Sequence, residues 1–79
     1  KTMKMEELIG RLEESENTDQ RALSKSMKRE FLKLEKEKDI DIRNNGFQFL
    51  KGCIKTMLAF GEITDAKENE LWHELFACL

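Results

Sequence analysis

The sequence has no proline and no tyrosine, and only four glycines, two cysteines and one histidine among its 79 residues. The glycines are scattered, so the chain has no glycine-rich loop that could cradle a phosphate group. Two cysteines are too few for the disulfide framework of a small secreted protein. We therefore expect two reduced, half-buried thiols and a cytoplasmic location.

Long apolar runs are also missing, because no stretch approaches the roughly 20 residues that span a bilayer. No signal peptide is visible, and Met3 or Met5 is a candidate native start. The formal net charge is only −2, so overall charge does not favour nucleic acid as a partner.

What the chain does contain is a nearly equal mixture of charged residues (38%) and apolar residues (39%). This composition is typical of a charge-rich helical protein. We predict a single all-α domain over residues 1–79, a small bundle of three or four helices that ends in a tight antiparallel helical hairpin. A chain this short buries roughly 60–65% of its unfolded surface, and such a chain often adds a partner.

The spacing of apolar residues predicts helices at about 3–15, 18–38, 41–60 and 64–78. Asn17 or Thr18 is expected to cap the second helix, and Asp39 or Asp41 the third. Gly61 occupies a position suited to a left-handed cap residue, and Thr64 is expected to cap the last helix.

The third helix has apolar residues around well over half of its circumference, which predicts that it is the central helix of the bundle. The connection that follows it is very short, so the last two helices should form the antiparallel hairpin. The preceding segment "KDIDIRNNGF" alternates apolar and polar residues, but over too few positions to predict a strand.

A metal site and a catalytic site are both unfavoured by the pattern. His73 and Cys78 lie five residues apart on one helix and should diverge, and neither Cys53 nor Cys78 belongs to a CxxC pair. Both thiols lie on apolar helix faces, where burial raises a thiol pKa and makes the group inert. The carboxylates alternate with lysines as solvated faces do. We predict no metal, no cofactor and no enzymatic activity.

The second helix carries a row of cations opposite its apolar stripe, here called the basic ridge. It consists of Arg21, Lys25, Arg29, Lys33 and Lys36. Like charges at this spacing repel one another, and phosphates or an acidic protein could relieve that repulsion. A solubilising face is the simpler interpretation, and an accessory nucleic-acid-binding protein is the alternative.

The carboxyl-terminal part of the chain holds more apolar side chains than one small bundle can bury. We predict a protein–protein interface that includes Phe60, Leu71, Trp72, Leu75, Phe76 and Leu79. The partner is expected to be a second copy of the chain, as a homodimer, or another protein. The predicted function is that of a non-enzymatic interaction module, such as a small regulator, inhibitor or assembly factor, in the style of small bacterial proteins.

The last hairpin carries two short resemblances. "GEITDAKENELWHEL" is similar to the bacterial helical hairpins of the SHOCT type, through its glycine, isoleucine, capping threonine and spaced leucines. That resemblance implies an oligomerisation or docking segment. "TDAKEN" resembles the inhibitory motif of the antitoxins of Fic-type AMP-transferases, which would imply that Glu68 obstructs a nucleotide site, with Thr64 and Asn69 at the ends of the motif.

Overall fold

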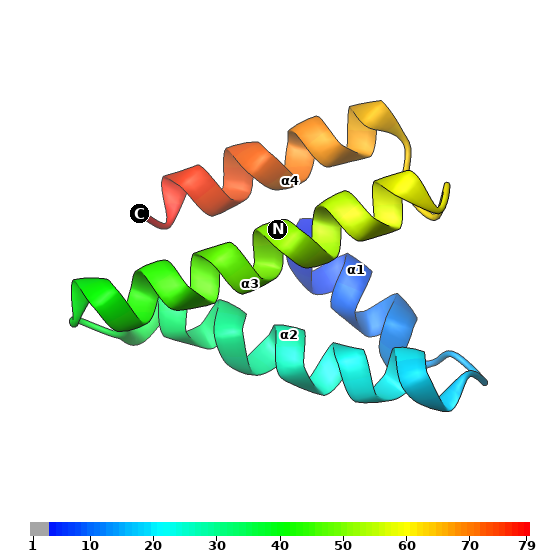
Figure 1. Cartoon of the computed structure of the whole chain (residues 1–79), viewed down its shortest axis with the longest axis horizontal. Coiled ribbons are helices and arrows are strands. Elements are labelled where there is room, and N and C mark those ends of the chain that lie inside the picture. Colours follow the sequence, from blue (N-terminus) through cyan, green and yellow to red (C-terminus); the bar gives the residue numbers. More distant parts are fainter. Residues whose placement is uncertain (1–3) are drawn as a thin grey trace.

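The computed structural model describes residues 4–79, which form four helices and no strand (Figure 1). The helices are α1 (Lys4–Glu13), α2 (Thr18–Lys36), α3 (Ile40–Ala59) and α4 (Asp65–Ala77). The predicted all-α bundle is confirmed, and the helix ends within the described range lie within two residues of their predicted positions. Met3, the expected first residue of the first helix, lies outside the described residues.

Three side-chain caps start the helices at the positions that the sequence indicates. The Asn17 carboxamide oxygen accepts a hydrogen bond from the Asp19 backbone N–H at 2.8 Å. Asp39 does the same at the start of α3, and the Thr64 hydroxyl oxygen accepts from the Lys67 N–H at 3.1 Å at the start of α4. Each cap satisfies a backbone donor that has no partner within its own helix.

Gly61 ends α3 and turns the chain back into α4. Its φ of 73° lies in the left-handed region, which glycine adopts without steric strain. The Gly61 N–H donates to the Leu58 carbonyl oxygen at 3.0 Å, and the Glu62 N–H donates to the Met57 carbonyl oxygen at 2.8 Å. This pair of bonds is a Schellman motif, and it produces the tight antiparallel hairpin of α3 and α4.

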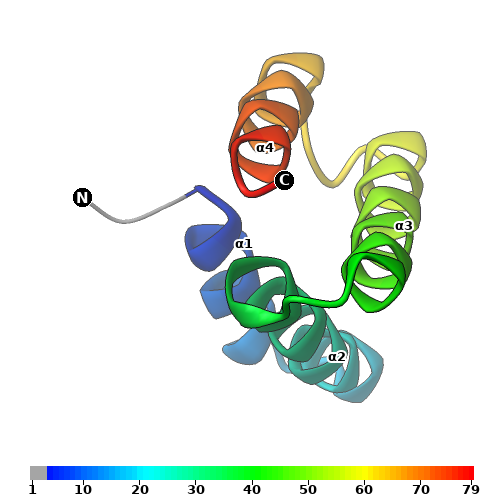
Figure 2. The same cartoon turned by 90° about the vertical axis from the view of Figure 1, so that its left-hand side faces the viewer.

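The four helices surround one apolar core when the bundle is viewed from its end (Figure 2). In that view α1 lies between α2 and α4, and α3 lies on the far side of the core. Every helix contributes buried apolar side chains; those of α1 are Met5, Leu8, Ile9 and Leu12. The short first helix therefore closes the side of the bundle that α2, α3 and α4 leave open.

The prediction that the third helix is central is wrong. α3 forms one wall of the bundle, and several of its apolar side chains face outward: Ile40 is 76% exposed, and Ile42 and Phe49 are each 39% exposed. The broad apolar distribution arises because the helix contributes both to the core and to the surface. Its buried apolar residues are Phe47, Leu50, Ile54 and Met57.

A carboxylate of α4 caps the amino-terminal end of α1. The two side-chain oxygens of Glu74 accept hydrogen bonds from the backbone N–H groups of Lys4 and Met5, the latter at 2.7 Å. A negative charge at this position also interacts favourably with the helix dipole. Because these residues lie about seventy positions apart, the contact attaches the first helix to the last.

We expect Glu74→Gln to lower the free energy of unfolding by about 1–2 kcal/mol, because it removes the charge and one of the two acceptor oxygens. In a domain of this size the melting temperature should fall by roughly 4–16 °C in a circular-dichroism melt. The control is Glu70→Gln, since Glu70 makes only exposed ion pairs with Lys4 and Lys67. Equal shifts for the two variants would contradict the capping role of Glu74.

Candidate functional site: an aromatic groove between α3 and α4

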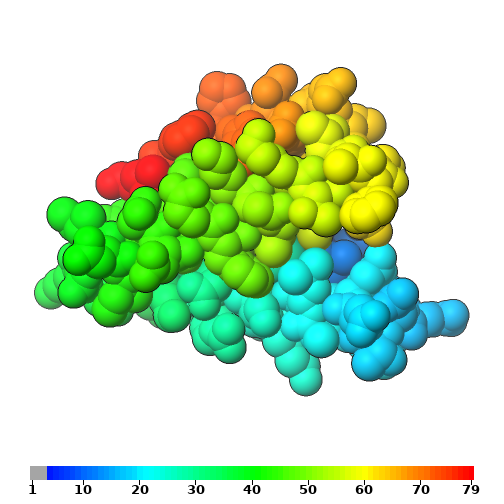
Figure 3. Space-filling model, viewed as in Figure 1, coloured from blue at the N-terminus to red at the C-terminus, as the bar shows by residue number. Residues whose placement is uncertain are grey.

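A shallow groove of about 260 Å³ runs along the outer side of the hairpin between α3 and α4. We call it the aromatic groove, and it is lined by Phe47, Lys51, Lys55, Trp72 and Phe76. Figure 3 shows that the side chains of the two helices form one continuous surface along the hairpin. The groove is open and lined by large side chains, which is the form of a surface that receives a helix or peptide.

Three aromatic rings form the floor of the groove. The ring centroids of Phe47 and Phe76 lie 5.6 Å apart, those of Trp72 and Phe76 6.2 Å, and those of Phe47 and Trp72 6.4 Å. All three pairs are tilted at 32–48°, and their separations fall within the favourable range for aromatic pairs. The mutual contacts give the cluster a defined shape while Phe76 stays 60% exposed.

Helical spacing places these side chains in line. On α3, Phe47, Lys51 and Lys55 follow one another at intervals of four residues. On α4, Trp72 and Phe76 stand four residues apart. Residues at this spacing share one face of a helix, so each helix presents one row to the groove.

The far end of the hairpin is held by Arg43, whose guanidinium donates from Nη2 to the carbonyl oxygen of Cys78. This contact joins the start of α3 to the end of α4 and places a cation at a helix carboxyl terminus, where the dipole favours it. The exposed side chains of Ile40, one turn before Arg43, and Leu79 therefore lie at the same end of the hairpin. They extend the apolar surface beyond Phe76.

The two lysines give the groove a positive rim. Within residues 4–79, neither Lys51 nor Lys55 forms an ion pair with a carboxylate. The Lys55 ammonium lies 6.0 Å from the centroid of the Trp72 ring, at the outer limit of a cation–π contact. An occupant of the groove would thus meet aromatic faces at the centre and positive charge at one edge.

The predicted interface residues separate into three groups. Leu71 and Leu75 have no exposed surface and belong to the core, so they are unavailable to a partner. The apolar face of α1 packs over this side of α4 and covers them. The other row of α4, namely Trp72, Phe76 and Leu79, remains on the surface.

Phe60 is the most exposed of the predicted interface residues, at 78%. It is the carboxyl-terminal cap residue of α3, next to the turn into α4. Figure 1 shows this turn and the carboxyl terminus at opposite ends of the hairpin. Phe60 therefore does not join Phe76 and Leu79 in a single patch.

The basic ridge of α2 is partly neutralised by its own surroundings. Arg29 and Lys33 both form ion pairs with Glu30, at 3.1 and 3.3 Å. Arg21 donates to the carbonyl oxygen of Ser15 at 2.8 Å. Of the five ridge residues, only Lys25 and Lys36 make no hydrogen bond or ion pair to another residue in the described part of the chain.

The two ion pairs of Glu30 change the pKa of its carboxyl group. Burial between α2 and α3 by itself raises the pKa of the carboxyl group, but the hydrogen bonds from Arg29 and Lys33 outweigh it and the pKa is lowered. The charged form of Glu30 is thus favoured in the folded protein. Its contribution to stability is present above the ordinary carboxyl pKa of about 4.3 and is lost as the pH falls through the lowered value.

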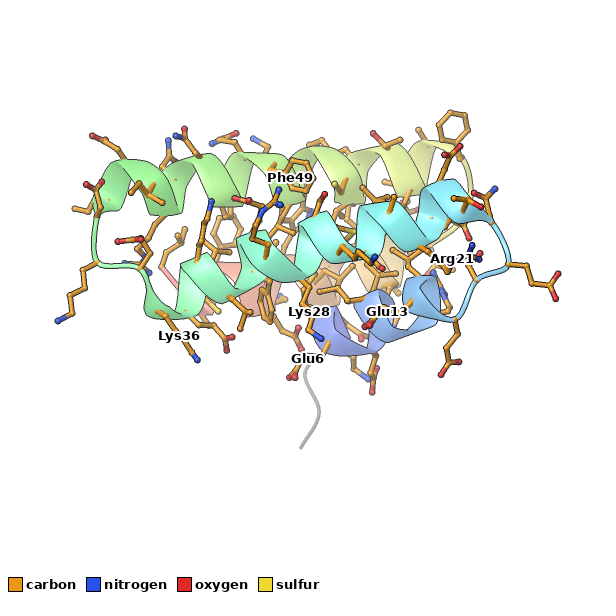
Figure 4. The ribbon with its side chains drawn as sticks, turned by 90° about the horizontal axis from the view of Figure 1, so that it is seen from below. Glu6, Glu13, Arg21, Lys28, Lys36 and Phe49 are labelled. Atoms are coloured by element: carbon orange, nitrogen blue, oxygen red, sulfur yellow. The ribbon has the colours of Figure 1, made fainter. Side chains whose placement is uncertain are left out.

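Acidic residues also flank α2 on its other side. Figure 4 shows Glu6 and Glu13 of α1 near Lys28 of α2, with Arg21 and Lys36 toward opposite ends of the helix. Glu6, Glu13, Lys28 and Glu35 line one shallow hollow between α1 and α2. A polyanion that approached the ridge would meet these carboxylates, so the surface around α2 is of mixed charge.

The cysteines and the histidine do not form a site. Burial raises the pKa of the Cys53 thiol, and it also raises that of Cys78, where the carboxylates of Glu35 and Glu74 add to the effect and Arg43 partly offsets it. His73 is exposed. No group of three or more His, Cys, Asp or Glu side chains within the described range is placed to hold a metal ion.

The groove contains residues that the sequence interpretation did not assign to the interface, namely Phe47, Lys51 and Lys55. The signal that could have found them is their four-residue spacing on the helix that precedes the hairpin turn. Since the turn makes the helices antiparallel, Phe47 is brought opposite Phe76. The lysines were not predicted because an isolated helix gives no reason to distinguish them from solvated charges.

No protein-family model matches this sequence, and neither a curated protein nor a solved structure is significantly similar to it. The resemblances to SHOCT-type hairpins and to Fic antitoxins therefore gain no support from the family models. Across residues 4–79, no helix has the combination of length and apolarity that crossing a bilayer requires.

Proposed function

We propose that this chain is a protein–protein interaction module that binds a helix in the aromatic groove between α3 and α4. The observation that carries the proposal is the position of Phe76, which is 60% exposed while its ring packs on Phe47 and Trp72. Clustered aromatic side chains at a concave, partly exposed surface are typical of binding hot spots. Groups that could carry catalysis are not brought together there, so we propose a non-enzymatic role.

The alternative functions receive less support from the molecule. A nucleic-acid interface on α2 would need free cations, but Arg29 and Lys33 are paired with Glu30 and acidic residues of α1 lie beside the helix. For an inhibitor of the Fic-antitoxin kind, Thr64 would belong to a motif, but its hydroxyl is used as the cap of α4. Neither alternative explains the aromatic groove.

The proposal can be tested with a displayed library of helical peptides, selected on the full-length protein immobilised at low density. We expect enriched peptides to carry apolar residues at intervals of three and four, and to lose affinity for Phe76→Glu by at least about tenfold. Trp72 is the only tryptophan, so its emission should shift to shorter wavelength when a peptide covers the groove.

Phe60→Glu is the matched control, because Phe60 is also exposed but lies outside the groove. It should bind the selected peptides as the parent does. Peptides that bind Phe76→Glu as tightly as the parent, or that leave Trp72 emission unchanged, would contradict the proposal.

A further inference from the structure

We infer that the partner of the aromatic groove is the hairpin of a second copy of this chain, in a dimer whose twofold axis runs along the groove, parallel to α3 and α4, so that the two grooves face each other. This inference rests on the proposed function and names the partner. It is carried by the opposite charges on the two helices that border the groove, and by the alignment of their side chains along the helix axes.

The two helices of the hairpin have opposite net charge. In α3 three cations (Arg43, Lys51 and Lys55) stand against one carboxylate (Asp41), a balance of +2. In α4 the only lysine, Lys67, stands against Asp65, Glu68, Glu70 and Glu74, a balance of −3. Glu70 and Glu74 contact α1, and Arg43 contacts Cys78, so the opposite charges at the groove itself are Lys51 and Lys55 of α3 and Glu68 of α4. Such a surface is complementary to its own copy turned by 180°, because the positive row of one copy then meets the negative row of the other.

The register follows from contacts within one protomer. Phe47 lies beside Phe76, and Trp72 contacts both the Phe47 ring and the Lys55 ammonium, so Trp72 is level with Lys51, which lies between those two residues on α3. In antiparallel helices, positions 47, 51 and 55 of α3 are therefore level with positions 76, 72 and 68 of α4. An axis parallel to the helices preserves these levels while it exchanges α3 and α4. It therefore brings Phe47 against Phe76 of the second copy, and Lys55 against Glu68 of the second copy.

The charged groups brought together this way are available for pairing. Lys55 and Glu68 each lack an ion-pair partner within residues 4–79. Glu68 precedes Trp72 and Phe76 by one and two helical turns, so it shares their face of α4. Two symmetric Lys55–Glu68 pairs would thus form at the edges of an apolar contact made by the aromatic rings.

The apolar surface at the end of the hairpin fits the same arrangement. Ile40, Phe76 and Leu79 are 76%, 60% and 58% exposed in the single chain. A monomer rarely leaves large side chains grouped on one surface in this way. The twofold arrangement covers Phe76 directly and brings this end of each hairpin beside the same end of the other.

Light scattering over a hundredfold dilution of the full-length protein tests the dimer. We expect a dimer that dissociates on dilution, and we expect Phe76→Glu to raise its dissociation constant by about 30-fold or more. Phe60→Glu should leave the dissociation constant within about twofold of the parent. Circular dichroism should show unchanged helicity for both variants, because both side chains are mostly exposed.

A charge exchange tests the register separately. Lys55→Glu and Glu68→Lys should each weaken the homodimer about tenfold, because each variant places like charges in both contacts. Mixed in equal amounts, the two variants should form a heterodimer close to parental affinity, since both of its pairs are then of opposite sign. Lys36→Glu, on the far helix α2, is the matched control and should change nothing.

A monomer at millimolar concentration would overturn the inference. If groove-selected peptides still bound that monomer and shifted Trp72 emission, the proposed function would stand with a different protein as the partner. A dimer lost in Phe60→Glu but kept in Phe76→Glu would place the interface elsewhere. A dimer insensitive to the charge exchange would overturn the proposed register.

Discussion

Replacing Leu71 by alanine is expected to lower the free energy of unfolding by about 2–5 kcal/mol. Leu71 has no exposed surface and packs in the common core from the middle of α4. Alanine would leave a cavity that the surrounding helices can fill only partly. Since a domain of this size is stable by roughly 4–12 kcal/mol, the variant should lose a large fraction of its stability.

The measurement is urea denaturation followed by circular dichroism, with Leu79→Ala as the matched control. Leu79 is the same residue type and lies just beyond the end of α4, but it belongs to the row of Trp72 and Phe76 and is 58% exposed. Its truncation should change the free energy of unfolding by less than about 0.5 kcal/mol. Similar losses for the two variants would mean that α4 does not present the faces described above.

Replacing Gly46 by leucine should cost about 2–3 kcal/mol of stability, although leucine is the better helix former by nearly 1 kcal/mol. Gly46 of α3 faces α2, and a Cβ atom at Gly46 would stand 3.2 Å from the backbone carbonyl oxygen of Glu30. A backbone atom cannot rotate away as a side chain can. The larger side chain would therefore push the two helices apart.

Gly52, in the same helix, is the control for this prediction. A Cβ atom at Gly52 would meet nothing within 4 Å, so Gly52→Ala should raise the free energy of unfolding by about 0.5–1 kcal/mol through helix propensity alone. Thermal melts of both variants give the comparison. A stabilised Gly46→Leu protein would show that the α2–α3 crossing is looser than the structure has it.

The local structure of this protein was predictable because it depends on neighbours along the chain. Asn17, Asp39 and Thr64 cap helices through hydrogen bonds that span two or three residues, and Gly61 reverses the chain through its own backbone conformation. The all-α class and the hairpin follow from such features together with apolar periodicity. The sequence also indicates that the last helix carries two rows of apolar residues, more than the core of one small bundle can bury.

The sequence does not show which of the two apolar rows of the last helix is buried in the core and which stays on the surface. Leu71 and Trp72 are adjacent and equally apolar in the pattern, but α1 packs on the side of α4 that carries Leu71 and leaves Trp72 at the groove. The position of α1, about sixty residues earlier in the chain, decides which row is buried. Glu74 helps to hold α1 in that position.

The sequence by itself therefore determined the helices, their caps and their amphipathic faces, because each is set by interactions a few residues apart. Only the tertiary structure decided that α3 lies at one side of the bundle and that Glu30 forms ion pairs with two cations of the basic ridge. It also decided which residues line the aromatic groove, namely Phe47, Lys51, Lys55, Trp72 and Phe76. These features require helices to meet at particular angles and levels. That geometry is a property of how the whole core packs, and no single segment of the chain specifies it.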